Sequence, residues 1–132
     1  MSANASTSPS SVDASNAANQ DGLAELRREF ASLKDHVARF AAQQTALLES
    51  CWEMLAPRGR LVYASCSVLT AENADVVGAF LKGQARAVDV TGSARLLMPG
   101  ALPWRTAGAG CALPSGAADA DGFYYACLEK RA

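Results

Sequence analysis

The stretch GRLVYASCSVLTAEN, residues 59–73, joins a predicted strand to a predicted helix. Residues 60–66, RLVYASC, are mostly apolar or aromatic and contain no breaker, which indicates a short strand. Thr70 suits the cap of a helix over residues 71–82, which Gly83 then ends. In open α/β sheets, ligands bind beyond the carboxyl ends of the strands. The thiol of Cys66 is therefore predicted to lie at the edge where chemistry is expected.

The role of Cys66 has two interpretations on local grounds. A helix N-terminus favours the charged thiolate of a nearby cysteine, which makes Cys66 a candidate nucleophile. A small residue at the end of a strand more often serves packing. Spacing alone leaves both interpretations open.

The N-terminal part of the chain contains two kinds of sequence. Residues 1–21 are dominated by Ser, Ala and Asn, have almost no bulky apolar side chain, and are expected to be disordered. From residue 22 to residue 55, apolar residues recur three and four positions apart, which predicts a helix or two helices meeting near Ser32. The same stripe also fits a coiled coil, although charges at the flanking positions are sparser than is typical.

The rest of the chain alternates between strand and helix patterns. A second strand is expected over residues 85–91, a Gly- and Pro-rich loop over 92–120, and a last strand over 121–130 with both faces covered. This order predicts an α/β fold, the second half of an open sheet, within a domain covering residues 22–132.

Composition bears on several classes of function. The net charge of −1 lacks the basic excess that is typical of nucleic-acid binders. A local basic patch is still compatible with this charge, and its candidates are Arg27, Arg28, Arg39, Arg58 and Arg60. We predict no metal site, because the four cysteines form no CxxC pair and the single histidine is distant. The sequence also shows no signal peptide and no membrane span, so we expect a cytoplasmic protein with reduced thiols.

Two separated motifs resemble the RsmB/Sun-like (RsmB/NOP-type) RNA cytosine-5 methyltransferases. The first reads LLESCWEMLAPRGRLVYASCSVLTAENADVVGAFL and resembles the family's Leu-Leu helix, Pro-x-Gly-Gly turn, Ala-Thr-Cys-Ser-Val strand end and Glu-Asn helix start, with Ser65 in place of the usual Thr. The second, LPSGAADADGFYYACLEKR, resembles the family's closing Asp-Gly-Phe-Phe-x-Ala-x-Leu-x-Lys. The resemblance spans residues 35–131 and implies the C-terminal half of a Rossmann-like class I methyltransferase sheet.

This resemblance implies a mechanism and a site. Cys66 occupies the position of the family's nucleophile, which attacks carbon six of a cytosine in RNA, here expected to be ribosomal RNA. Carbon five then takes a methyl group from S-adenosylmethionine. Ser67 and Asn73 border the same sheet edge and are candidates for positioning the base, with helix capping as an equal alternative.

The sequence departs from the family pattern in its first half. The glycine-rich cofactor loop and the Asp-x-Pro-Cys motif expected before residue 44 are absent from this sequence. We therefore expect a truncated family member that is inactive alone and has no cofactor-binding residues of its own. The alternative is a non-catalytic remnant that contacts RNA, or that associates with itself or a partner chain through the helical stripe or an open sheet edge.

Overall fold

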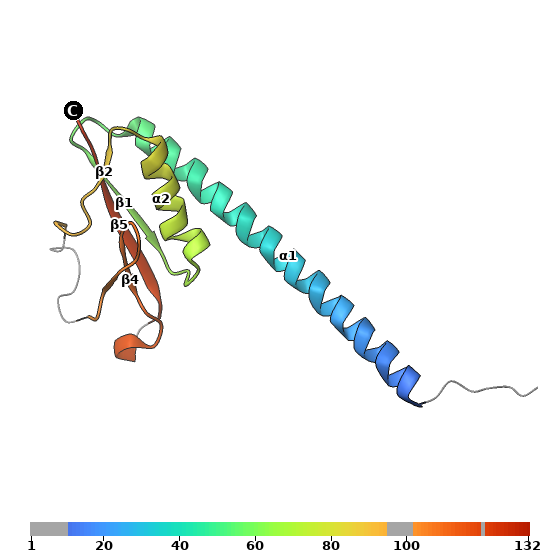
Figure 1. Cartoon of the computed structure of the whole chain (residues 1–132). Helices are drawn as coiled ribbons and strands as arrows, with labels where there is room; N and C mark the ends of the chain where they lie inside the picture. Colours follow the sequence, from blue (N-terminus) through green and yellow to red (C-terminus); the bar gives the residue numbers. More distant parts are fainter. Residues whose placement is uncertain (1–10, 95–101, 120) are drawn as a thin grey trace, which may run out of the picture. The chain divides into compact units, whose positions relative to one another are not determined.

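The computed structural model describes residues 11–94, 102–119 and 121–132 (Figure 1). The chain divides into two units, Met1–His36 and Val37–Ala132. Helix α1 is one continuous element, Ser11–Met54, rather than two helices meeting near Ser32.

The start of α1 differs from the sequence-based expectation. Residues 11–21 are helical, although we expected them in a disordered tail. This stretch contains several alanines, the best helix former, so it can be helical without an apolar stripe. Residues 1–10 of the expected tail lie outside the described residues.

The unit Val37–Ala132 contains a five-stranded sheet in which every pairing is antiparallel. Its strands are β1 (Arg60–Ser65), β2 (Ala87–Asp89), β3 (Arg105–Thr106), β4 (Cys111–Leu113) and β5 (Phe123–Lys130). Helix α2 (Ala74–Gly83) follows β1, and two short 3₁₀ helices, η1 (Thr70–Glu72) and η3 (Ala117–Asp119), complete the regular structure.

Strand β5 is the centre of the sheet. One edge pairs with β1 along its length, in a register that places Leu61 opposite Leu128. The other edge is shared between β4 near the start of β5 and β2 near its end. Because β1 and β2 are both antiparallel to β5, they run in the same direction as each other. The mixed helix and sheet architecture agrees with the predicted α/β class.

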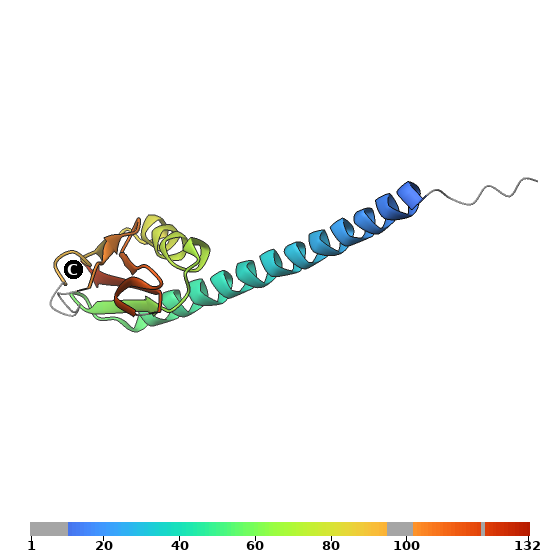
Figure 2. The same ribbon diagram turned by 90° about the horizontal axis from the view of Figure 1, so that it is seen from below.

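The two faces of β5 contact different parts of the chain, as predicted for a strand covered on both sides. Figure 2 shows α2 over one face of the sheet, where the last turns of α1 also pack. The core on that face consists of Leu48, Trp52, Val76, Val77, Phe80, Tyr124, Ala126 and Leu128. On the opposite face, Tyr125 and Cys127 are buried with Ala94. The indole of Trp52 meets the ring of Phe80 edge to face at 5.3 Å.

The segment 92–120 differs from the plain loop that we expected. It contains β3, β4 and η3, and β4 extends the sheet beyond β5. Residues 95–101 of this segment lie outside the described residues. The turn before β1 also has an unexpected feature, because Arg58 adopts a φ of 65° between Pro57 and Gly59.

Candidate active site

Cys66 directly follows the last residue of β1 and is exposed to solvent. The predicted strand therefore ends one residue earlier than expected. The helix that follows also begins later, since η1 covers Thr70–Glu72 and α2 starts only at Ala74. The thiol thus lies on a loop at the carboxyl end of β1, accessible to a large substrate.

Short-range hydrogen bonds define the shape of this loop. The Ser65 hydroxyl accepts a hydrogen bond from the backbone N–H of Ser67 at 3.0 Å. The Ser67 hydroxyl in turn accepts one from the N–H of Leu69 at 3.2 Å. Such serine turns fix the backbone on either side of a residue. Cys66 is therefore the middle residue of the first of two consecutive turns.

Asn73 ties the far end of the loop to its beginning. Its side-chain amide donates a hydrogen bond to the backbone carbonyl of Ser67 at 2.7 Å, so the two predicted positioning residues are in direct contact. Asn73 precedes α2 and is only 5% exposed, but its side chain makes no capping hydrogen bond to the helix. Its Oδ1 atom has no hydrogen-bond partner among the described residues. Buried acceptors of this kind are rare and often belong to binding sites.

A pocket of about 310 Å³ adjoins this loop. One wall comes from the segment after Cys66, with Ser67, Val68, Thr70 and Asn73 among its residues. The other wall comes from the chain around β4 and the start of β5, with Leu113, Pro114, Ser115, Phe123 and Tyr124 among its residues. The lining is mostly apolar with a few hydroxyl and amide groups, which is typical of small-molecule sites.

Sequence patterns did not predict the second wall of the pocket, because it depends on long-range packing. Gly122 offered the only local signal. A Cβ atom on Gly122, the residue before β5, would lie 2.7 Å from a methyl group of Val68, so a larger residue there would displace the Val68 side chain. The glycine of the DGFYY motif therefore lies close to two residues that line the pocket, Val68 and Ser115.

Two tyrosines near the site hold neighbouring segments through hydrogen bonds of their hydroxyl groups. The hydroxyl of Tyr63 on β1 donates a hydrogen bond to the backbone carbonyl of Glu72 at 2.5 Å, which anchors η1. The Tyr124 hydroxyl donates to the carbonyl of Ala109. Burial, and secondarily the Glu72 carboxylate, raises the pKa of Tyr63, while burial and then Asp89 raise the pKa of Tyr124. Both phenols therefore remain neutral donors at physiological pH.

A second groove, of about 240 Å³, lies between α1 and β1 within the unit Val37–Ala132. It is lined by Gln44, Leu47, Leu48, Cys51, Leu61, Val62, Tyr63 and Ala64. The edge of β1 that faces away from β5 pairs with no strand among the described residues. Leu47 and Val62 are 66% and 50% exposed, so this face of the unit is apolar.

The remaining cysteines occupy other environments. Cys127 is buried on β5, where burial raises the pKa of its thiol, while Cys51 and Cys111 are half-buried. Within the described part of the chain, no group of three or more His, Cys, Asp or Glu side chains is arranged to hold a metal ion. Neither α1 nor α2, as far as the structure describes them, combines the length and apolar character of a bilayer-spanning helix.

Comparison with known proteins identifies the family. Residues 21–129 match the profile of the 16S rRNA methyltransferases RsmB/F, so the match begins earlier than the resemblance seen from residue 35. The chain is 38% identical over 96 residues to the ribosomal RNA small subunit methyltransferase B of Xanthomonas campestris. It is 44% identical over 87 residues to the protein of the same name from Xylella fastidiosa, and 41% identical over 104 residues to that from Pseudomonas syringae.

These alignments cover 66–73% of this chain but only 19–21% of each relative. The chain thus spans about a fifth of the length of the curated relatives that it matches. The family profile, over residues 21–129, includes the β1–α2 loop and most of the closing strand. This chain belongs to the RsmB/F family of 16S rRNA methyltransferases.

Proposed function

We propose that this chain carries the nucleophilic half of an RNA cytosine-5 methyltransferase site, with Cys66 as the nucleophile and ribosomal RNA as the substrate. The observation that supports this proposal most directly is the position of Cys66. It is an exposed thiol at the carboxyl end of β1, one residue before Ser67, which lines a mostly apolar pocket of about 310 Å³; Cys66 itself is not part of the pocket lining.

The proposed chemistry begins with addition of the thiolate to the base. The Cys66 sulfur forms a bond to carbon six of cytosine, and the π electrons of the carbon five–carbon six double bond shift toward carbon five. Carbon five becomes nucleophilic, so a difficult alkylation is divided into two easier steps. Once carbon five carries the methyl group, its proton passes to a base such as water, the electrons of that C–H bond restore the double bond, and the sulfur leaves as the thiolate. The base must leave its stack to reach Cys66.

Ser67 and Asn73 are proposed as positioning residues in this step. Asn73 holds the loop through the Ser67 carbonyl, and its remaining oxygen is a buried acceptor beside the pocket. Cytosine carries an exocyclic amine, which is a donor complementary to such an acceptor. A small adjustment of the Asn73 side chain would bring these two groups together.

The methyl donor that the family implies is S-adenosylmethionine, and the described residues do not fit it. An adenosine ligand on an open α/β sheet is held by a glycine-rich turn and by a carboxylate on the ribose. Neither of the two pockets described above has an Asp or Glu in its lining. We therefore propose that this chain alone neither binds the donor nor methylates RNA.

A chimeric enzyme tests the proposal. The 96 matching residues of the Xanthomonas relative are replaced by those of this chain, and the product is incubated with S-adenosylmethionine and small-subunit rRNA containing 5-fluorocytosine. We expect a covalent protein–RNA complex, because fluorine at carbon five prevents release of the methylated base. Cys66→Ser should abolish the complex, whereas the matched control Cys51→Ser should retain it. Trapping that survives Cys66→Ser would remove Cys66 from the mechanism.

Titration calorimetry tests the statement about the donor separately. This chain alone should give no binding heat with S-adenosylmethionine, while the chimera should bind it. Clear binding by the chain alone would show that it carries a donor site after all, without affecting the role of Cys66.

The second candidate function is a non-catalytic module that associates with a partner chain. The apolar groove between α1 and β1, together with the unpaired edge of β1 among the described residues, favours this candidate. It predicts a chimera that folds and binds RNA but forms no covalent complex.

A further inference from the structure

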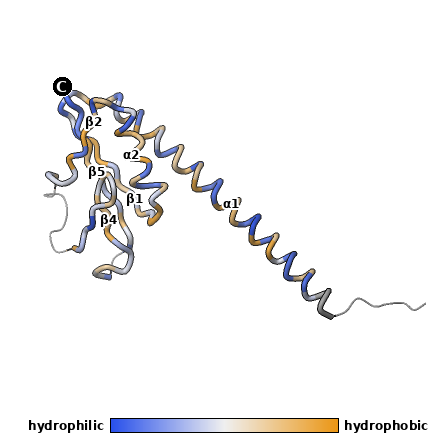
Figure 3. The backbone as a smooth tube through the Cα atoms, viewed as in Figure 1, coloured by the Kyte–Doolittle hydropathy of each residue, from blue (hydrophilic) through white to orange (hydrophobic). Residues whose placement is uncertain are grey.

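The N-terminal unit exposes a row of large apolar side chains. Leu23, Leu26, Phe30 and Leu33 of α1 are 50%, 61%, 63% and 58% exposed. Figure 3 shows apolar and polar residues alternating along α1. Scattered exposed apolar residues are ordinary, but a contiguous row of this size marks an interaction surface.

The spacing of the row defines its geometry. The intervals of three, four and three residues place all four side chains on one face, at the a and d positions of a heptad repeat. Leu23 and Phe30 are the a positions, and Leu26 and Leu33 are the d positions. Side chains with this pattern fit into the equivalent row of a second helix.

The charges beside the row distinguish between possible partners. Arg27 and Lys34 occupy e positions, and Glu29 occupies a g position. In a parallel pair of identical helices, a g residue faces the e residue five positions later in the other helix. Glu29 of each copy then faces Lys34 of the other copy, giving two attractive contacts.

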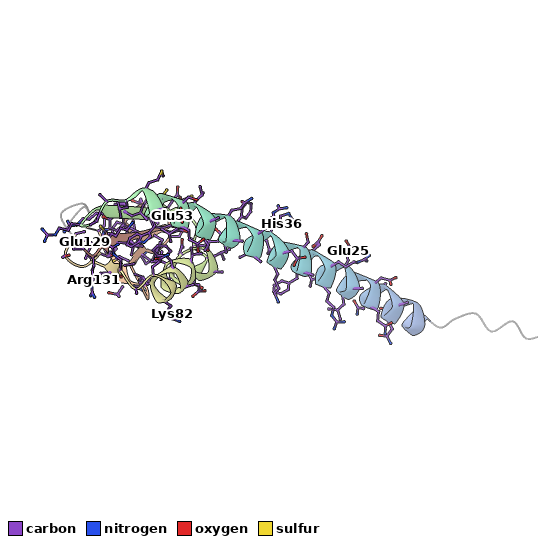
Figure 4. The ribbon with its side chains drawn as sticks, turned by 90° about the horizontal axis from the view of Figure 1, so that it is seen from above. Glu25, His36, Glu53, Lys82, Glu129 and Arg131 are labelled. Carbon is purple, nitrogen blue, oxygen red and sulfur yellow. The ribbon has the colours of Figure 1, made fainter. Side chains whose placement is uncertain are left out.

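An antiparallel pair brings e positions together instead. When Phe30 of one copy packs beside Leu33 of the other, Arg27 faces Lys34 and the two cations repel each other. The outward-facing charges do not compete for these contacts, since Glu25 and Arg28 pair with each other at 2.6 Å on the far side of the helix. Figure 4 labels Glu25 and His36 along α1 in this unit, where the His36 ring donates a hydrogen bond back to the Ser32 carbonyl at 2.8 Å.

We propose that residues 22–36 form a parallel two-stranded coiled coil with a second copy of this chain. The partner is a second copy because the surface is complementary to itself, in both its apolar row and its Glu29–Lys34 charge pattern. Two heptads bury only a few side chains per copy, so the dimer is weak and depends on protein concentration.

Sedimentation equilibrium of the full chain over a range of concentrations tests the proposal. We expect a reversible monomer–dimer equilibrium. Phe30→Ser should raise the dissociation constant about tenfold or more, since two apolar side chains leave the dimer interface. The matched control, Ala31→Ser, introduces the same residue one position along on the exposed outer side and should leave the dissociation constant unchanged. A monomer at all concentrations, or a dimer insensitive to Phe30→Ser, would overturn the proposal.

Charge substitutions test the orientation. Lys34→Glu places two glutamates opposite each other in a parallel dimer and should weaken it several-fold, whereas it would strengthen an antiparallel dimer by facing Arg27. The double variant Glu29→Lys with Lys34→Glu should restore the parallel dimer. Strengthening by Lys34→Glu alone would refute the parallel arrangement. Circular dichroism confirms that each variant keeps its helix content.

Discussion

Lys130 links the last strand of the sheet to the end of α1, and replacing it with methionine tests how the two are held together. The Lys130 ammonium donates hydrogen bonds to the backbone carbonyls of Trp52 and Leu55, at 2.9 and 2.8 Å. It also lies 5.3 Å from the centre of the Trp52 ring. Carbonyls at the end of a helix lack their usual helical partners; the Trp52 carbonyl accepts from the Leu55 N–H at 3.2 Å, and Lys130 adds a charged donor to both carbonyls.

The expected loss of stability follows from these contacts. A hydrogen bond involving a charged group contributes about 1.5–3 kcal/mol, and the cation at the helix C-terminus and over the ring adds about 0.5–1 kcal/mol for each effect. The contributions overlap and the site is half-buried. We therefore expect Lys130→Met to lower the free energy of unfolding by about 2–4 kcal/mol. Methionine keeps the apolar stem, so packing is little changed.

Urea unfolding followed by tryptophan fluorescence measures this loss, because both tryptophans lie in the unit Val37–Ala132. The unfolding midpoint should fall by about 1 M or more. The matched control is Lys82→Met, which removes an exposed lysine in the last turn of α2 and should cost less than about 0.5 kcal/mol. If the two variants lose the same stability, the Lys130 contacts do not hold the helix end.

Two further predictions concern the backbone and the pH dependence of the same unit. Arg58→Gly should raise the free energy of unfolding by about 0.5–1 kcal/mol, because glycine adopts a φ of 65° without strain. Urea titrations measure this gain. The control Arg58→Ala removes the side chain but keeps the backbone strain, so it should not raise the free energy of unfolding. Burial raises the pKa of Tyr63 above its ordinary value of 10.0, so the folded state holds this proton more tightly. Stability from this group is complete below pH 10.0 and is lost as pH rises through the folded pKa. The free energy of unfolding of Tyr63→Phe should therefore change less with pH in this alkaline range than that of the unsubstituted protein. Equal slopes of the free energy of unfolding against pH for these two proteins would contradict a raised pKa of Tyr63.

The sequence predicted the elements whose pattern is local. The strand before Cys66, α2, β2 and β5 all lie within a few residues of their predicted positions, because their apolar periodicity and flanking glycines are clear. The first turns of α1 were not predicted, because their helix formation depends on the high helix propensity of alanine and shows no stripe of large apolar residues. Strands β3 and β4 escaped it because they are two and three residues long, and pairing with the rest of the sheet, not local preference, makes them extended.

The candidate site also has one part that the sequence predicted and one part that it did not. The position of Cys66 at the end of β1 and its neighbours Ser67 and Asn73 followed from a single stretch of sequence, and the structure brings the last two into contact. The opposite wall of the pocket comes from residues more than forty positions later, so no local pattern could indicate it. The hydrogen bond of Tyr63 to Glu72 likewise depends on how η1 folds back over β1.

The central place of β5 has a consequence for the order in which the protein acquires its structure. Residues 123–130 come after every other strand in the sequence, yet β1, β2 and β4 each have β5 as a pairing partner. During synthesis, β1 and β2 leave the ribosome before their pairing partner β5, while β4 has only β3 to pair with until β5 follows. The pocket beside Cys66 includes Phe123 and Tyr124 and so forms only at this last step. A chain interrupted before residue 123 would therefore contain the proposed nucleophile but have no folded site around it.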